Sequence, residues 1–480
     1  MAMNYVVPNI RWAIKITNFL LSIVLALGIY FWLPYFNVVN SSARIIGGLI
    51  VIFSGYWVWN MAVHPWAHGL AYLPWIMICM EELLKRSSGN QLRKIAFCLI
   101  GLLFLLINSG YYWLQVAVPV IAARLIIELF WSTKERATSL KGLFIIGLCA
   151  FFAILLSFPR LGGIYAFQLT KFPRLGGEVA AMQVLGRNTL WIEMTLRSFF
   201  DGRIITQSIH SPCLGYFQDY TNFIGIAAIP FIMIGLVRLK PLLKNKIFIA
   251  LFLASLFQLA MTRTTHASEL LRFLCPLYKQ ISWYWRGSAI LLLFLSVLIA
   301  QGYQKVFTSK KRWVVVLDIV CIFVNLAEIT YVQMKHIDLS AAKPPLSEIM
   351  HATNIPPKPF LKHPFAPYCM GYIFGYGNEK PKEISVTDSS VYDEPVKGYF
   401  NMHDVRRLAS SEANGGYYLN HPWPLWPRKD VQEFERFINY KQVVTLPAWL
   451  KIMNIFSAFA WIIYLIFGLR ILTIAFNNTR

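Results

Sequence analysis

Candidate acid–base residues stand just before an apolar run that begins near Asn222. They are Asp201 and Asp219, and Tyr220 follows directly as a candidate substrate-binding residue. A carboxylate at a membrane surface can act as a general base or hold a metal ion, although Asp219 could equally cap the helix that begins near Asn222. We therefore take Asp219 and Asp201 as candidate catalytic residues. No cofactor motif is found, and a divalent metal is the one cofactor that these carboxylates allow.

Cations and aromatic rings alternate in the segment 263–286. Guanidinium groups bind phosphate through paired hydrogen bonds, and indoles stack on sugars or lipid. The segment is the best candidate for holding an anionic, lipid-linked headgroup, with Arg263, Arg272 and Arg286 as binding residues. The alternative is that these cations extend to the membrane surface beside interfacial aromatic residues.

Two histidines occur in His64-Pro-Trp-Ala-His68, shortly before Leu73-Pro-Trp75. An imidazole can contact a phosphate or a sugar hydroxyl, so His64 and His68 are candidate substrate-binding residues. The alternative is an aromatic belt at the membrane interface, with both histidines bonded to nearby backbone.

The composition is that of a membrane protein. Hydrophobic residues make up 57% of the chain and charged residues only 14%, whereas soluble domains are about half apolar and one quarter charged. The net charge of +22 comes from short basic clusters between apolar runs. This pattern favours topology signals and contact with membrane lipid over nucleic-acid binding, so no nucleic-acid partner is expected.

The apolar runs predict an all-α polytopic membrane bundle of about ten or eleven transmembrane helices, since a crossing needs about 20 apolar residues. An extracytoplasmic C-terminal segment of α/β or irregular structure is expected beside it. The predicted runs are 16–36, 44–63, 69–84, 94–109, 112–131, 141–158, 222–239, 246–262, 287–304, 312–333 and 446–472.

The basic clusters fall on alternate connections, which predicts a cytoplasmic C-terminus and places 159–221, 263–286 and 334–445 outside. The expected organisation is a multi-pass domain (1–333) with the outer loop 159–221, a polar extracytoplasmic segment (334–445) and a C-terminal helix (446–480). The same parity puts residues 1–15 outside, which would be ordinary if one more helix preceded Met1 or if a short run were re-entrant.

Three passages carry a resemblance to a known family. They are Ile45-Ile-Gly-Gly-Leu-Ile-Val-Ile-Phe-Ser-Gly55 with His64-Pro65 and Leu73-Pro-Trp75 behind it, Asp219-Tyr220 through Ile224-Gly225, and Leu274-Cys-Pro276 through Tyr284-Trp-Arg286. Together they span about residues 20–305 and resemble the YfhO-like bacterial membrane proteins, of the GT-C type superfamily of integral membrane glycosyltransferases.

The resemblance implies a GT-C-like bundle in the bacterial cytoplasmic (inner) membrane. It also implies transfer of a sugar from a polyprenyl-phosphate donor to an acceptor outside the cytoplasm. The superfamily has a first helix followed by an acidic catalytic loop, but residues 1–80 contain no Asp or Glu. The chain is therefore expected to be either a shortened enzyme, with Asp219 or Asp201 as base, or a non-catalytic relative.

Two other functions remain open. A transporter or flippase for a lipid-linked solute would carry charges within its spans, and Glu128, Asp318 and Glu328 fall within predicted runs. A membrane assembly partner would use 334–445 to bind another envelope protein.

Overall fold

A computed structural model describes most of the apolar part of the chain and little of its polar part. It covers residues 10–58, 65–85, 89–109, 113–131, 136–164, 196, 198–200, 222–261, 287–307, 399–401, 425–427, 448–477 and most of 316–331. Asp318 lies outside the described residues.

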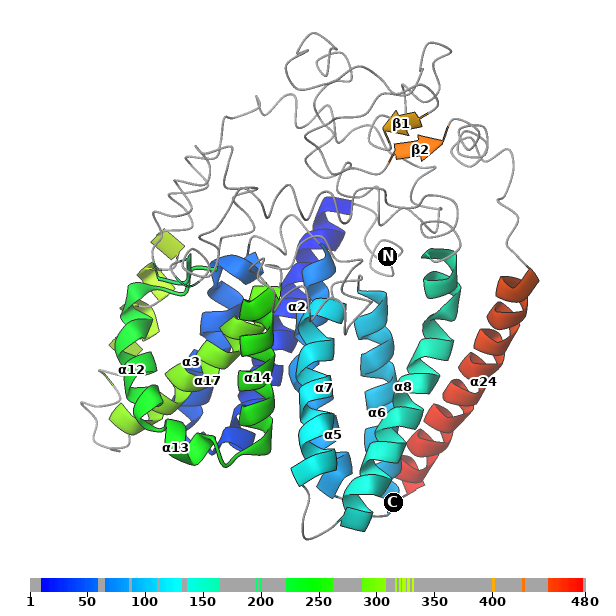
Figure 1. The fold of residues 1–480 in the computed structure, drawn as a ribbon, viewed down its shortest axis with the longest axis horizontal. Helices are drawn as coiled ribbons and strands as arrows, with labels where there is room; N and C mark the ends of the chain where they lie inside the picture. The colour runs from blue at the N-terminus through cyan, green and yellow to red at the C-terminus, as the bar shows by residue number, and fades with distance from the viewer. Residues whose placement is uncertain are drawn as a thin grey trace.

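The described residues form a bundle of helices (Figure 1). Ten α-helices make up its body: α2 (Ile10–Trp32), α3 (Ser41–Phe53), α5 (Leu73–Lys85), α6 (Asn90–Asn108), α7 (Trp113–Trp131), α8 (Arg136–Ile164), α12 (Ile229–Val237), α14 (Lys246–Met261), α17 (Ala289–Val306) and α24 (Ala448–Asn477). Shorter elements are η1 (Leu33–Phe36), η2 (Pro65–Tyr72), η5 (Ile226–Ala228) and α13 (Leu239–Leu242). Two short strands, β1 (Tyr399–Asn401) and β2 (Leu425–Pro427), pair antiparallel within the predicted polar segment.

Five segments are long and apolar enough to cross a membrane, so the described chain has the character of an integral membrane protein. They are Lys15–Phe36, Asn90–Asn108, Thr138–Gly162, Ala289–Val306 and Ala448–Ile474. Each overlaps a run predicted from the sequence. Three shorter apolar segments, Ser41–Phe53, Ile226–Val237 and Lys246–Met261, overlap three more.

Several described basic residues lie at one end of the bundle, called the basic end below. The helices α5, α7 and α17 end there, and α6, α8 and α14 begin there (Figure 1). Described cations at or beside these helix ends are Lys85, Lys141, Lys240, Lys244, Lys246 and Lys305. The last helix, α24, also ends at the basic end (Figure 1). The described members of the basic clusters that were predicted to lie on alternate connections are therefore at a common end of the bundle.

The predicted run 44–63 is interrupted after Phe53, where α3 ends. Residues 55–58 are helical again, and 59–63 lie outside the described residues. The hydroxyl of Ser54 donates to the carbonyl of Val51 at 2.7 Å and accepts from the backbone N–H of Trp57 at 3.2 Å. The next N–H, that of Gly55, donates to the distant carbonyl of Phe223 at 2.9 Å. Side-chain and long-range bonds thus replace helical ones and turn the chain.

The predicted run 69–84 is divided into two elements, the 3₁₀ helix η2 and the α-helix α5. The division falls just before Pro74, which stands in the first turn of α5. Proline lacks the N–H that a helix interior needs but fits the first turn, so α5 begins there rather than continuing η2.

The helices α12 and α17 approach each other closely enough to require glycine on both. A Cβ at Gly235 would collide with the backbone carbonyl of Leu298, and one at Gly302 with that of Phe231. Small residues allow such backbone contact between helices in membranes, where packing replaces the hydrophobic effect.

We predict that Gly302→Ala and Gly235→Ala each destabilise the protein by about 1–3 kcal/mol, because the added methyl group meets backbone that cannot rotate away. Thermal unfolding in detergent measures the effect. Gly147→Ala is the matched control, since a Cβ at this glycine of α8 meets no atom within 4 Å. Equal melting temperatures for all three variants would contradict the close packing of α12 and α17.

Candidate functional site

Three buried polar side chains form a hydrogen-bonded chain at the end opposite the basic end, where α17 begins. The side-chain amide of Asn222 donates to the hydroxyl of Ser198 at 2.9 Å, and the hydroxyl of Ser288 donates to the Asn222 carbonyl oxygen at 2.8 Å. All three residues are at most 2% exposed. We call Ser198, Asn222 and Ser288 the polar junction, because they join three segments that are distant in sequence.

Backbone hydrogen bonds reinforce the polar junction. The N–H of Ile224 donates to the carbonyl of Phe199 at 2.9 Å, directly beside the bond between Asn222 and Ser198. The bond from Gly55 to Phe223 adds the chain that leaves α3. Gly225 adopts φ 96°, a conformation that favours glycine, and lets the chain turn into η5.

Glu328 binds the start of η5. Its two carboxylate oxygens accept from the backbone N–H groups of Ile226 at 2.7 Å and Ala227 at 3.0 Å. A carboxylate at a helix N-terminus satisfies N–H groups that have no helical acceptor and complements the helix dipole. Glu328, which falls within the predicted run 312–333, thus has hydrogen-bond partners in the protein.

Gly287, just before α17, lets the helix α14 pack closely against the start of α17. A Cβ at Gly287 would overlap the side-chain amide of Gln258, which is buried in α14. The polar end of Gln258 therefore lies against the backbone next to Ser288. The end of the bundle that holds the polar junction therefore brings together five segments: those from α3, α14 and α17 and the chain around residues 198 and 222.

Most predicted site residues lie outside the described residues: His64, Asp201, Asp219, Tyr220, Arg263, Arg272 and Arg286. For three of them, the structure describes a residue of the polar junction two or three positions away in sequence, which we call the anchor. Asp201 follows Ser198 by three residues, Asp219 precedes Asn222 by three, and Arg286 precedes Ser288 by two.

His68 is the one predicted site residue that the structure describes. It lies in η2, and its Nε2 atom is buried with no hydrogen-bond partner in the described part of the chain. The indoles on either side are packing groups: Trp57 donates to the hydroxyl of Ser22 and Trp75 to the carbonyl of Val24, both at 2.8 Å. Trp57 is 1% exposed, so it does not belong to an aromatic belt facing lipid.

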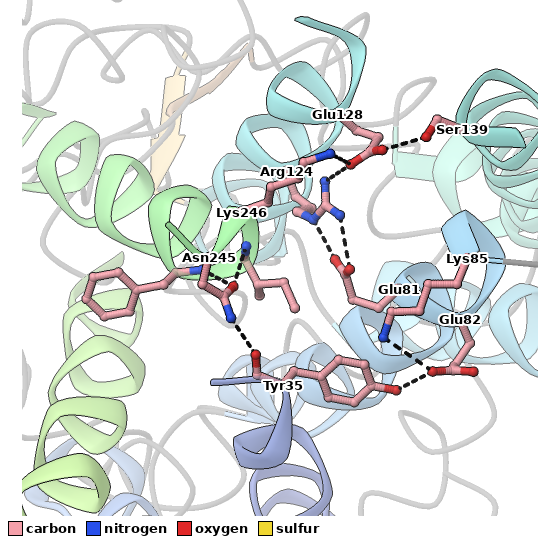
Figure 2. A network of polar contacts seen from close by, with 11 residues as sticks. Tyr35, Glu81, Glu82, Lys85, Arg124, Glu128, Ser139, Asn245 and Lys246 are labelled. Atoms are coloured by element: carbon pink, nitrogen blue, oxygen red, sulfur yellow. Dashed lines mark hydrogen bonds and ion pairs between the residues drawn. The ribbon is translucent and has the colours of Figure 1, made fainter. Parts of the chain in front are cut away.

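A second polar cluster, at the basic end, is an ion-pair network centred on Arg124 (Figure 2). The guanidinium of Arg124 bridges two carboxylates: Nε and Nη2 donate to Glu81, and Nη1 donates to Glu128 at 2.8 Å. Glu128 also accepts from the Ser139 hydroxyl at 2.6 Å and from Lys246 at 3.0 Å. The network thereby joins α5, α7, α8 and α14.

The ion-pair network balances its own charge. Arg124, Glu81 and Glu128 are at most 5% exposed, and Lys246 completes two cations against two carboxylates. Such a buried cluster is tolerated in an apolar interior because each carboxylate is paired and hydrogen-bonded. The sequence indicated Glu128 but not its partners. Arg124 and Glu128, four residues apart in an apolar helix, were the available signal.

Neighbouring contacts extend the network to the end of α2. The hydroxyl of Tyr35 donates to Glu82 at 2.8 Å, and the ammonium of Lys85 lies 4.5 Å from the centre of the Tyr35 ring. The side-chain amide of Asn245 donates to the backbone carbonyl of Tyr35 at 2.5 Å (Figure 2). The basic end is therefore connected through side chains from η1 to α14.

Comparison with known proteins adds no relative: no protein-family model, curated protein or solved structure matches this chain. Among the residues that the structure describes, no group of three or more His, Cys, Asp or Glu side chains could hold a metal ion. The function must be argued from the polar junction, the ion-pair network and His68.

We predict that Arg124→Met costs about 3–5 kcal/mol of stability, because it leaves the buried carboxylates of Glu81 and Glu128 without their shared cation. Unfolding in mixed micelles at increasing dodecyl sulfate measures the loss. Lys246→Met is the matched control and should cost about 1 kcal/mol or less, since this lysine is partly exposed and Glu128 keeps its other partners.

The triple variant Arg124→Met, Glu81→Gln, Glu128→Gln should recover much of that loss, because it removes the uncompensated charges along with the cation. A triple variant no more stable than Arg124→Met would show that packing of the guanidinium, rather than charge balance, holds α5 and α7 together.

Proposed function

We propose that this chain is a polytopic membrane glycosyltransferase of the GT-C type, related to the YfhO-like proteins. It would transfer a sugar from a polyprenyl-phosphate donor to an acceptor outside the cytoplasm. The single observation that carries the proposal is the polar junction. It joins the three places in the described chain that stand two or three residues from Asp201, Asp219 and Arg286.

The chemistry of sugar transfer from a lipid phosphate needs these residue types close together. A carboxylate takes the proton of the acceptor hydroxyl, and a guanidinium binds the phosphate that leaves. Asp219 or Asp201 would supply the base, and Arg286 with Arg263 and Arg272 would hold the phosphate. In this proposal, anchors that bond directly to one another would keep the segments bearing the base and the cation within reach of one substrate.

The arrangement of the bundle supports an orientation in the membrane that puts the polar junction outside the cytoplasm. Lys and Arg favour the cytoplasmic side of a membrane protein, so the basic end would face the cytoplasm. The polar junction lies at the opposite end and would open outside, where a lipid-linked donor presents its sugar. About ten or eleven crossings of the inner membrane, with α24 returning the C-terminus to the cytoplasm, complete the proposed topology.

The ion-pair network does not by itself favour a transporter. Transporters bind their solutes near the middle of the membrane, beside broken helices and polar groups available for the solute. Here the buried charges lie at the basic end, and each carboxylate of the network is bonded within the protein. They suit a fixed helix contact better than a passage for solute.

We predict that Asp219→Asn or Asp201→Asn lowers kcat for sugar transfer by about 100-fold or more, because the amide cannot accept the proton. Transfer of labelled glucose from polyprenyl-phosphate glucose to membrane acceptors, in nanodiscs, measures the rate. Asn222→Ala should lower kcat less severely by loosening the anchor, with folding checked by melting temperature.

Glu82→Gln is the matched control, because it removes an acidic charge at the basic end, far from the polar junction. Transfer that persists unchanged in the Asp201→Asn, Asp219→Asn double variant would refute both assignments. An intact protein that binds the donor but transfers nothing would indicate a non-catalytic relative.

A further inference from the structure

We call the segment formed by η2 and α5, which covers the predicted run 69–84, the broken span. Trp75 donates to the carbonyl of Val24, and a Cβ at Gly28 would meet the side chains of Trp75 and Pro74. Val24 and Gly28 lie in the middle of the apolar segment Lys15–Phe36. The α-helical half of the broken span therefore starts level with the middle of α2 and runs to the basic end, while η2 covers the other half.

The non-α half of this span is packed inside protein. It contacts α2, α5, α6 and α7. A Cβ at Gly69 would meet the hydroxyl of Ser109 and the side chain of Leu106, so η2 lies directly against the end of α6. Leu70 and Ala71 are buried as well. Irregular backbone at membrane depth occurs where it is enclosed by protein or lines a binding cavity, as in broken-helix binding sites.

Within η2, the imidazole of His68 has a buried polar atom, Nε2, without a hydrogen-bond partner among the described residues. A buried polar atom without a partner costs free energy that an apolar residue of similar shape would avoid. Such a group calls for an explanation, and a ligand that bonds to Nε2 would supply the missing partner.

The surroundings decide the chemistry of the ligand. Charging an imidazole in an apolar interior is unfavourable, so His68 offers a neutral nitrogen. One neutral nitrogen makes one hydrogen bond, which matches a hydroxyl group that both donates and accepts. A phosphate instead requires cationic donors, such as the guanidiniums predicted in the segment 263–286.

We propose that His68 is a specificity-determining residue of an intramembrane binding site, where Nε2 hydrogen-bonds a hydroxyl of the sugar on the lipid donor. This inference rests on the proposed function and deepens it by separating sugar from phosphate recognition. The chain that contains His68 starts beside the polar junction, because Gly55 bonds to Phe223 next to Asn222.

The first test examines the protein without donor. His68→Phe keeps an aromatic ring and removes the polar atoms, so its melting temperature in nanodiscs should equal or exceed that of the unaltered protein. Trp57→Phe is the matched control: it removes the bond from the buried indole to Ser22 and should lower the melting temperature by about 2 °C or more. A loss in His68→Phe as large as in Trp57→Phe would overturn the proposal, because the imidazole would then have a partner in the protein.

The second test compares two lipids that share the phosphate. Polyprenyl-phosphate glucose should raise the melting temperature of the unaltered protein more than polyprenyl phosphate does. In His68→Phe the two lipids should give equal shifts. A difference that survives in the variant, or no difference in the unaltered protein, would overturn the role of His68.

If neither lipid shifts the unaltered protein, the proposed function fails, and octyl glucoside below its micelle concentration then tests His68 separately. A saturable shift in the unaltered protein but not in His68→Phe would support a hydroxyl site without the proposed donor. Equal shifts in both, or none in either, would overturn that site too.

Discussion

The constraint on which this structure depends is that a bilayer supplies no hydrogen bonds, so each break in a helix must be bonded within the protein. The described chain meets this requirement at several breaks. Ser54 and Gly55 find partners where α3 ends, and Glu328 accepts the first N–H groups of η5. Asn40 caps α3 with its side chain and donates to the carbonyl of Phe307, after α17. Helix ends thereby become the points at which distant segments are joined.

The same constraint explains why the two ends of the bundle differ. At the basic end, cations lie at helix ends, and an acidic residue within a neighbouring helix can be a buried partner, as Glu128 is for Lys246. At the other end the polar junction consists of neutral groups, Asn222, Ser198 and Ser288, and the Glu328 carboxylate binds the backbone N–H groups that follow it. The basic end is held by ion pairs between side chains, and the other end by bonds that contain no ion pair among these groups.

The sequence predicted the long helices well, because a run of about 20 apolar residues has few alternatives to a helix in a membrane. The run 141–158 falls within α8, and 446–472 coincides with α24 from Ala448 onward. It did not predict the interruption after Phe53 within the run 44–63, where Gly55 bonds to Phe223, a residue far along the chain. Hydrophobicity alone carries no information on such a pairing.

The candidate site was less predictable than the helices. Residue types indicated His68 as a binding residue, but only the packing shows a buried Nε2 atom without a partner among the described residues. Glu81 and Arg124 are 43 residues apart in sequence, so their ion pair has no local signal. Lys246 was interpreted only as a topology signal, since a lysine at a helix start is typical of a cytoplasmic loop. These contacts arise from tertiary structure and not from spacing.

The neutral character of the polar junction bears directly on the proposed chemistry. A cation at Asn222 or Ser288 would form an ion pair with a nearby carboxylate and lower its ability to accept a proton. It would also compete with the substrate-binding guanidiniums for the phosphate. Amide and hydroxyl anchors position the backbone without adding a charge, so Asp219 and Arg286 would respond mainly to the substrate. The charge-balanced network at the basic end keeps its ions similarly apart from the site, because each of its carboxylates is already paired.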